Sequence, residues 1–450
     1  MKRLICFASI LRPAACIAPL FLLTLCLATA FLLCPGLARS EEADDATAAV
    51  LADVEAKTMD NLHLIQDHLN ARLKDDDTTF AEAWRMRLIR WSMAGPVAPI
   101  SSWIVEGLGD SAWARNAFFF IMPVVRWMSE PFLFPVETDV GPGRQAQELD
   151  KVFALMSRLR QRGYSATLDN VGDASSSPEE AEAYRNYYLT LIRDFAAHDR
   201  GPELFMSLKL SALTFDLEQV LNPGETGLAK RRDIKAALAE LLIAAAQSGK
   251  DVFLRIDMEE YAFKDMTLQI FREVVEENRE AAVADDGSLR LGVVIQAYLR
   301  DAAADVQRLA AWGLDQGFRV PVRLVKGAYL RHEREAAEEA GILCPVWSHK
   351  PSTDASFEAV CGYMLLNRDA IQPAFATHNI RSQAHVMALA QVFGVEQDEL
   401  EFQMLYGMGD PIQQTVAAMG WPMREYIPAG SLARGLKYAG RRFQELANSD

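Results

Sequence analysis

The stretch from Val320 to Arg331 reads VPVRLVKGAYLR and is the best single guide to the fold. Val320 to Val325 alternates branched apolar residues with others, as a buried strand does. The run ends at Lys326 and Gly327, and helix-forming residues follow from Arg331 to Ala340. The pattern therefore predicts a strand, a tight turn and a helix.

Arg323 and Lys326 place two cations on or just after this strand. A strand buried between helices should not carry unpaired charge in its interior, because desolvating an ion is costly. The cations therefore need an anionic or electron-rich partner. That partner is either a bound ligand or a neighbouring carboxylate in an internal ion pair, and the stretch alone does not choose between them.

Similar strand-like runs recur between amphipathic helical segments from about residue 151 to the end of the chain. With the first stretch they number eight, at 166–168, 205–210, 252–258, 291–298, 320–325, 374–377, 402–406 and 425–428. Strands that alternate with helices in this way over ~300 residues predict an α/β fold, a (βα)8 TIM-like barrel with its site at the C-terminal strand ends. A doubly wound open sheet is the alternative.

Polar residues occupy the C-terminal ends of most of these predicted strands. They are Asp169, Lys209, Asp257, Gln296, Arg323 with Lys326, and His378. Side chains of mixed charge that converge on one barrel mouth are costly unless a ligand or mutual pairing satisfies them. We therefore take them as candidate site residues, with a purely structural role as the alternative for each.

A last predicted helix, SLARGLKYAGRRFQELA, covers residues 431–447. One face is apolar, and the opposite face carries Tyr438, Arg441, Arg442 and Glu445 at helical spacing. Such a face is ordinarily a solvated surface. If the helix crosses the barrel mouth instead, its adjacent arginines are suited to bind a carboxylate bidentately.

Composition excludes several classes of function. The formal net charge of −15 argues against a nucleic-acid partner. No G-x-G-x-x-G follows a strand, and no Walker, H-E-x-x-H or G-x-S-x-G motif is present, so no metal site is expected. Outside the first 40 residues only Cys344 and Cys361 remain, and we interpret them as free thiols, although the sequence does not exclude a disulfide between them.

The N-terminal third contains no catalytic motif. Residues 1–40 begin with Lys2, Arg3 and Arg12 and then run apolar to Cys34, which predicts a cleaved signal peptide or a membrane anchor. A misassigned start codon, with a cytoplasmic protein, is the third interpretation. Residues 41–150 are expected to form a helical arm, in which the apolar runs 117–125 and 131–136 pack against the core or contact a membrane.

The ordered motifs of residues 151–450 resemble the proline dehydrogenase family, the flavin-dependent barrel found alone or as a domain of bifunctional proline utilisation enzymes. The matching segments are LDNVGDA (168–174), SLKLSAL (207–213), RIDMEE (255–260), VIQAYLRD (294–301), VRLVKGAY (322–329), STD (352–354), FATHN (375–379), EFQMLYGMGD (401–410) and YIPAG to GRRFQE (426–445). They cover almost the whole predicted barrel in family order.

The resemblance implies FAD as the cofactor and assigns a role to each matched residue. The flavin contacts would be Gln296, Arg323, Lys326, Ala328, Thr353, His378 and Asn379, with Arg323 near the reactive ring nitrogen. The substrate carboxylate would be held by Lys209, Arg441 and Arg442, and the substrate wall would include Asp257, Leu405, Tyr426 and Tyr438. Asp169 and Glu445 match acidic residues near the site, and Asp173 departs from the family's usual Glu.

The activity that the resemblance implies is oxidation of L-proline to 1-pyrroline-5-carboxylate by hydride transfer to FAD. This is the first step of proline catabolism to glutamate, and the electrons would pass to a quinone or another acceptor, in the family usually a membrane quinone. Two alternatives stay open: oxidation of a related cyclic or N-methylated amino acid, and a non-catalytic barrel that binds an amino acid.

Overall fold

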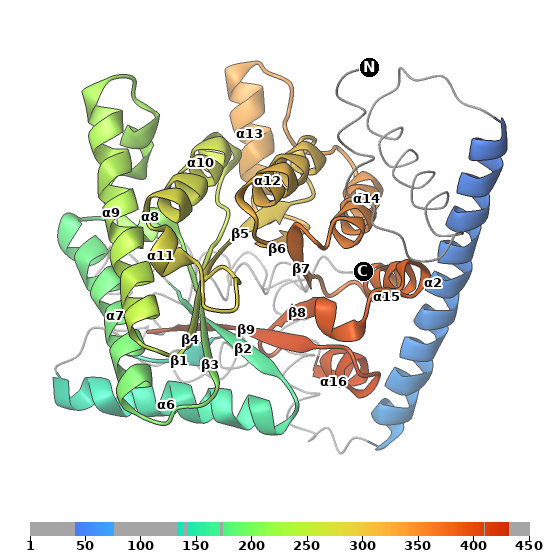
Figure 1. Cartoon of the computed structure of the whole chain (residues 1–450), viewed down its shortest axis with the longest axis horizontal. Coiled ribbons are helices and arrows are strands. Elements are labelled where there is room, and N and C mark those ends of the chain that lie inside the picture. Colours follow the sequence, from blue (N-terminus) through green and yellow to red (C-terminus); the bar gives the residue numbers. More distant parts are fainter. Residues whose placement is uncertain (1–40, 76–132, 138–141, 172–173, 409, 432–450) are drawn as a thin grey trace, which may run out of the picture.

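The computed structural model describes residues 41–75, 133–137, 142–171, 174–408 and 410–431. Within them, β2 to β9 pair in parallel, each with the next, and β9 also pairs with β2, so the sheet closes into an eight-stranded barrel surrounded by helices (Figure 1). Closure excludes the open doubly wound sheet and confirms the predicted barrel.

All eight predicted strands are present. They are β2 Ser165–Asn170, β3 Glu203–Leu208, β4 Asp251–Ile256, β5 Leu291–Gln296, β6 Val320–Val325, β7 Ile371–Ala376, β8 Glu401–Leu405 and β9 Met423–Gly430. The bounds of β6 agree with the prediction, whereas β3, β4 and β5 each end two residues earlier than predicted. Lys209 and Asp257 therefore lie just beyond their strands, in the loops at the barrel mouth.

The helices follow the strands in the order that a parallel barrel requires. They are α7 Pro178–Ala197, α8 Leu210–Leu213, α9 Glu225–Gln247, α10 Tyr261–Glu277, α11 Arg279–Ala282, α12 Ala302–Gln316, α13 Leu330–Ala340, α14 Lys350–Leu366, α15 Ile380–Phe393 and α16 Asp410–Ala418, with short 3-10 turns at Leu217–Leu221 and Gln397–Glu399. Local sequence fixes several ends. Ser177 caps α7 by accepting the Glu180 backbone N–H at 3.2 Å, and Gly317, with φ 78°, ends α12 in the left-handed conformation.

The described part of the arm packs against the barrel. α2, Glu41–Asp75, is one continuous helix that runs along α15 and α16 (Figure 1), where the Thr58 hydroxyl lies 3.3 Å from His385 Nδ1. α6, Pro142–Gln161, crosses the position chosen for the arm boundary and leads into β2. A short strand that the sequence did not reveal, β1 Phe134–Pro135, adds to the sheet beside β9.

The residues on either side of β1 show whether the apolar run 131–136 packs into the core or faces a membrane. Leu133 and Val136 are each 1% exposed, so this portion packs into the core rather than facing a membrane. No helix in the described ranges is long and apolar enough to cross a bilayer.

Some of the sequence predictions lie outside the described residues. They concern the leader 1–40, the run 117–125, Asp173 and the predicted helix 431–447 apart from Ser431. Cys344 and Cys361 are free thiols, as expected.

Candidate active site

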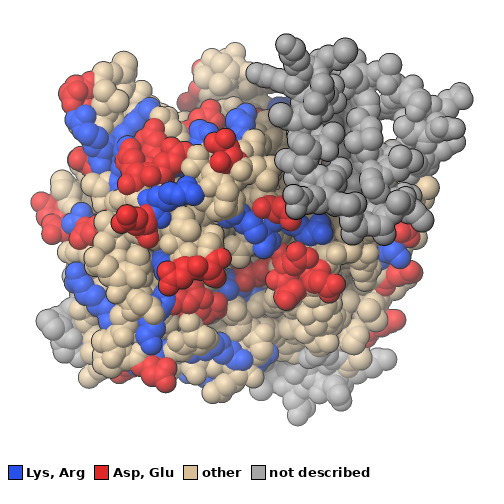
Figure 2. Space-filling model, in the orientation of Figure 1, with Lys and Arg blue, Asp and Glu red and all other residues tan. Residues whose placement is uncertain are grey.

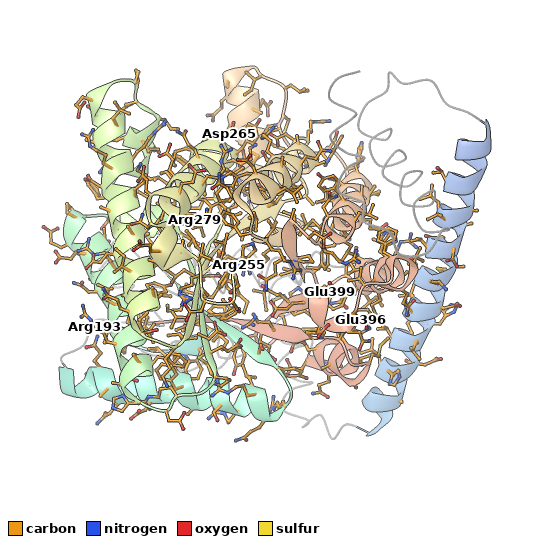
Figure 3. All side chains as sticks on the ribbon, viewed as in Figure 1. Arg193, Arg255, Asp265, Arg279, Glu396 and Glu399 are labelled. Atoms are coloured by element: carbon orange, nitrogen blue, oxygen red, sulfur yellow. The ribbon has the colours of Figure 1, made fainter. Side chains whose placement is uncertain are left out.

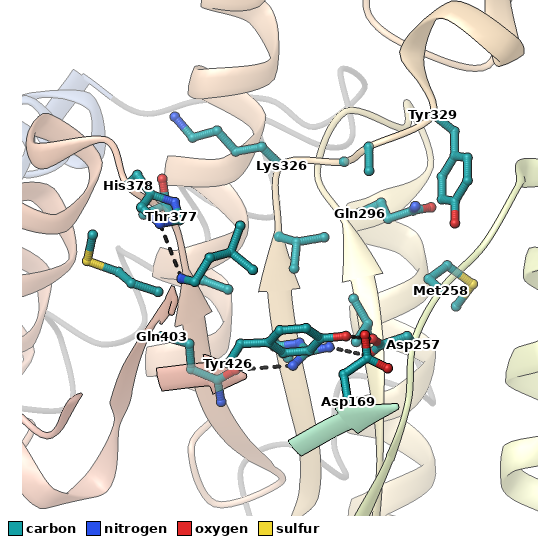
Figure 4. A pocket seen from close by; sticks show the side chains of 18 of the residues that line it. Asp169, Asp257, Met258, Gln296, Lys326, Tyr329, Thr377, His378, Gln403 and Tyr426 are labelled. Atoms are coloured by element: carbon teal, nitrogen blue, oxygen red, sulfur yellow. Dashed lines mark hydrogen bonds and ion pairs between the residues drawn. The ribbon is translucent and has the colours of Figure 1, made fainter. Parts of the chain in front are cut away.

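The C-terminal ends of the strands surround a cavity of about 360 Å³. Most of the candidate residues line it, drawn from separate strands and the loops that follow them (Figure 4). They are Asp169, Lys209, Asp257, Gln296, Arg323, Lys326, Ala328, His378, Leu405 and Tyr426. The structure thus brings together residues that are more than 250 positions apart in the sequence.

Two candidates lie beside the cavity rather than in its lining. Asn379 caps α15, because its side-chain oxygen accepts the Ser382 backbone N–H at 3.0 Å. Thr353 lies in the first turn of α14, next to Asp354, whose carboxylate pairs with Lys326. The remaining candidates, Tyr438, Arg441 and Arg442, lie outside the described residues.

Arg323 is held inside the barrel by several groups. Its Nη2 donates to Asp257, and its Nη1 lies 3.3 Å from both Ser207 Oγ and Gln403 Oε1. The guanidinium carbon lies 5.0 Å from the centre of the Tyr426 ring. The internal carboxylate partner considered from sequence therefore exists, but Arg323 Nε is buried with no hydrogen-bond partner among the described residues.

Acidic groups share the centre of the site. Tyr426 directs its hydroxyl at Asp257 and donates to it at 2.7 Å, with Asp169 close to both (Figure 4). Burial raises the pKa of Asp169 to about 6, and the neighbouring Asp257 adds to this effect while Lys209 opposes it. A carboxyl group in this position changes its charge close to neutral pH.

Lys209 is the cation with the fewest close partners in this group. Burial lowers its pKa, but the charges of Asp169, Glu259 and Asp257 outweigh that effect and raise it overall, so the ammonium stays charged. No carboxylate of the described residues comes within salt-bridge distance of it. Lys209 also lines a second cavity of about 1010 Å³ that adjoins the first, so it stands where a ligand could reach it.

Lys326 and His378 lie on the other side of the cavity (Figure 4). The Lys326 ammonium pairs with Asp354 and donates to Ser382 Oγ at 3.1 Å. His378 Nε2 accepts the Leu405 backbone N–H at 3.2 Å, so that nitrogen carries no proton and a neutral ring holds its proton on Nδ1. A backbone amide therefore orients the ring and selects its tautomer.

Gly327, directly after Lys326, also lines the cavity and packs closely against an aromatic ring. Gly327 has φ 125°, and a Cβ on it would approach the Tyr298 ring to 2.5 Å, so no larger residue fits there. Gln296 donates through Nε2 to the Glu259 carbonyl at 3.3 Å and leaves its Oε1 buried without a partner in the described chain. No group of His, Cys, Asp and Glu in the described residues is arranged to hold a metal.

Sequence reasoning missed several residues that line the cavity. They include Met258, Tyr329, Thr377 and Gln403. Tyr329 and Met258 stand beside candidates in the quoted motifs, so the signal was present but assigned no role. Gln403 also lies in a quoted motif, EFQMLYGMGD, and likewise received no role, because the strand pattern does not say which polar residues face the barrel interior.

The chain is similar to several known proteins. A family model described as "Proline dehydrogenase" matches residues 152–450. The chain is 30% identical over 284 residues to Proline dehydrogenase 1 of Bacillus subtilis, covering 63% of this chain and 79% of that protein. It is 29% identical over 305 residues to the carbapenem antibiotics biosynthesis protein CarD of Pectobacterium carotovorum, covering 67% of this chain and 77% of that protein.

A solved structure agrees with these matches. Proline utilization A (PutA) from Bdellovibrio bacteriovorus, inactivated by N-propargylglycine, superposes with a TM-score of 0.75 and 28% identity over 88% of this chain. The present chain spans 42% of the length of that protein.

Proposed function

Because the chain belongs to the proline dehydrogenase family, we propose that it oxidises L-proline to 1-pyrroline-5-carboxylate with FAD as the electron acceptor, in the first step of proline catabolism to glutamate. The observation that carries this proposal is one cavity in which Arg323 Nε and Gln296 Oε1 are buried without a hydrogen-bond partner among the described residues, and which the Lys209 side chain also lines. They match a carboxylate-bearing substrate beside a ring that both accepts and donates hydrogen bonds.

The residues present fit a flavin. Its ring system offers acceptors to a buried donor such as Arg323 Nε and an N–H to a buried acceptor such as Gln296 Oε1. Gly327 and Ala328, which carry little or no side chain, line the cavity just past the end of β6, where a flat ligand would meet no bulky side chain from these two positions. Gln296, Arg323, Lys326, Ala328 and His378 are therefore the residues that we propose to hold the ring, with Thr353 and Asn379 contacting more distant parts of the cofactor.

The reaction divides between cofactor and protein. A ring C–H bond next to nitrogen breaks, its electron pair leaves as hydride, the nitrogen lone pair forms the C=N bond, and the amine proton is lost. The flavin supplies the hydride acceptor. The chain binds the carboxylate, orients the carbon and keeps the cation of Arg323 in place, and this positioning accounts for most of the rate enhancement.

Substrate binding follows from the charges at the mouth. We propose that Lys209 binds the carboxylate together with Arg441 and Arg442 of the C-terminal segment, a set carried over from the family motif. The side chains of Asp257, Leu405, Tyr426 and Tyr438 then form the wall around the substrate ring. Acidic and basic side chains are interspersed over the face in Figure 2, which fits a small-molecule substrate better than a nucleic acid.

An absorbance experiment tests the proposal. The purified chain is expected to carry non-covalent FAD that bleaches when L-proline is added without oxygen, with 1-pyrroline-5-carboxylate formed in equal amount. D-Proline and L-alanine are matched controls, since one has the wrong configuration and the other lacks the ring. A protein that stays colourless after refolding with FAD, or whose flavin proline does not bleach, would refute the function.

A second candidate substrate has one observation in its favour. The similarity to CarD shows that a relative of comparable identity carries a name from antibiotic biosynthesis. Family members therefore do not all carry a proline-catabolism name, and a related cyclic or N-methylated amino acid, left open by the sequence, stays the alternative substrate. Rates of flavin bleaching by L-proline, hydroxyproline and N-methylated proline under identical conditions decide between them.

The electron acceptor and the leader complete the proposal. We propose that the reduced flavin passes its electrons to a quinone-type acceptor, and that residues 1–40 direct the chain to a membrane or across it. The apolar run and the flanking Lys2, Arg3 and Arg12 support this targeting role. Full-length protein found entirely in the cytoplasm, with its leader intact, would argue against it.

A further inference from the structure

A chain of hydrogen bonds runs through the barrel interior away from the cavity. Gln403 accepts from Arg323 Nη1 at 3.3 Å and donates through Nε2 to Glu401 Oε1 at 2.6 Å. The other oxygen of Glu401 accepts from Arg424 Nε at 2.7 Å, and Arg424 also donates to both carboxylate oxygens of Glu203, at 2.9 and 3.2 Å. We call the residues Gln403, Glu401, Arg424 and Glu203 the interior column.

The composition of this column is unusual for a parallel barrel. Such interiors are mostly filled by branched apolar side chains, because a buried charge is costly to desolvate. Here Arg424 and Gln403 are 4% and 2% exposed, and Arg255 is also buried within the barrel (Figure 3). Arg424 stacks on the Phe205 ring at 3.9 Å. An arrangement this costly in the middle of the barrel calls for a role other than stability.

Each residue of the interior column can only donate or only accept at a given atom, and this determines how the next side chain must be oriented. An ionised carboxylate only accepts, so Glu401 requires the NH2 end of the Gln403 amide. The amide oxygen of Gln403 must then face Arg323. Glu401 is itself fixed, because its second oxygen is engaged by Arg424. The amide of Gln403 therefore has one favourable orientation instead of two.

This orientation matters at Arg323. Without Gln403, the Arg323 guanidinium would be held at Nη2 by Asp257 and at Nη1 by the Ser207 hydroxyl, which can rotate. The amide oxygen of Gln403 has a fixed position and therefore holds the guanidinium plane at Nη1. The Nε–H then keeps one direction, and this is the buried donor for which the described residues supply no acceptor. The cation faces the flavin site in a fixed orientation before any ligand binds.

We propose that Gln403 is a positioning residue that fixes the guanidinium plane of Arg323, and that Glu401 and Arg424 act at the site by fixing the Gln403 amide. The inference rests on the proposed function and assigns these residues a role that acts through Arg323 rather than through contact with the substrate. It predicts that changes at Glu401, beyond the cavity lining, are felt at the flavin.

The primary test is Gln403→Leu, which keeps the size of the side chain and removes both hydrogen bonds. Flavin reduction at saturating L-proline is expected to slow by roughly tenfold or more, the size usual for partners that orient a functional group. The flavin midpoint potential is expected to become more negative, because a misdirected cation stabilises the reduced flavin less. The dissociation constant for L-proline should change by less than about twofold, since a role through Arg323 leaves substrate capture intact.

Two further variants separate positioning from general damage. Ser207→Ala removes the other acceptor of Arg323 Nη1, also at 3.3 Å but outside the interior column, and is expected to have the smaller effect. Glu401→Gln preserves shape and does not touch the cavity, yet it removes the group that selects the Gln403 amide orientation. It should move the potential in the same direction as Gln403→Leu, and FAD titration of each apoprotein gives a readout that does not depend on turnover.

A double-mutant cycle decides the inference. If Gln403 acts through Arg323, adding Gln403→Leu to Arg323→Met causes no further loss in the rate of flavin reduction. Additive losses, or a Gln403→Leu variant with wild-type rate and potential, would overturn the positioning role. Wild-type protein that proline does not reduce would instead overturn the proposed function, so the two failures are distinct.

Discussion

The polar groups in the barrel interior differ between its two ends. In the upper half, at the cavity, some of them lack partners, and in the lower half, at the interior column, they are paired. At the cavity, Arg323 Nε and Gln296 Oε1 are buried without partners in the described chain. Below it, Arg424 is hydrogen-bonded by Glu203, Glu401 and the Ala166 carbonyl. Satisfied groups give a rigid base, and unsatisfied groups mark where a ligand completes the structure.

Arg255 lies between the two halves, and its lowered pKa shows the effect of incomplete pairing on a buried cation. Its Nη1 finds no hydrogen-bond partner in the part of the chain that the structure describes, and its guanidinium carbon lies 5.0 Å from the Phe253 ring centre. Burial, with the nearby Arg323 and Arg424, lowers the pKa of Arg255 to about 9. The negative charge of Glu401 in the interior column raises the pKa of Arg255, so this carboxylate stabilises the charged form of an arginine that it does not contact directly.

The largest expected effect is that of Arg424→Leu in the lower half, which tests whether the paired groups there form a rigid base. Removing one partner of a buried pair leaves Glu203 and Glu401 uncompensated, and we expect a loss of about 3 to 5 kcal/mol in the free energy of unfolding. Urea denaturation measures it. Arg232→Leu is the control, because the ion pair of Arg232 with Glu225 is exposed and should contribute less than about 1 kcal/mol. Equal losses in the two variants would mean that the lower half is not the rigid base.

The next prediction concerns Asp169 in the upper half and depends on pH. Its pKa is raised from 3.8 to about 6 in the folded chain, so the folded state holds this proton more tightly than the unfolded state. Stability from this group is present below pH 4 and is lost as the pH rises through about 6. Asp169→Asn cannot ionise, so it should gain about 3 kcal/mol relative to wild type between pH 4 and pH 7. Parallel unfolding free energies across that range would contradict the raised pKa.

Much of the fold could be predicted because the signal was local. β6 combines alternating apolar residues with a following glycine, and its bounds were recovered. The predicted end of β3 was too late, because Leu210 is apolar but belongs to the short helix α8. Hydrophobicity reports burial rather than hydrogen bonding. β7 starts earlier than predicted, since Pro373 interrupts the pattern inside the strand.

The site was partly predictable for a different reason. A parallel barrel brings all C-terminal strand ends to one mouth, so polar residues at those ends could be grouped without knowing any contact. The pairing of Arg323 on β6 with Asp257, in the loop after β4, had no local signal. Glu401, Gln403 and Arg424 alternate with apolar neighbours as solvent-facing residues do, and only closure of the sheet places them inside.

Lys209→Met has the smallest expected effect in free energy and most directly separates function from stability. Lys209 makes no salt bridge within the described chain, so only its longer-range attraction to Asp169 and the neighbouring carboxylates is lost when the ammonium is removed, and the free energy of unfolding should fall by no more than about 1 kcal/mol. The substrate carboxylate loses a partly desolvated partner, which costs on the order of 2 kcal/mol, or roughly a thirtyfold fall in kcat/KM for L-proline. The same variant should keep its full FAD content, because the proposed flavin contacts lie across the cavity. Lys209→Arg restores the charge but not the shape and is expected to recover part of the loss. A Lys209→Met protein with unchanged kcat/KM and lowered stability would make Lys209 a structural cation and remove the main distinction between the two halves of the barrel.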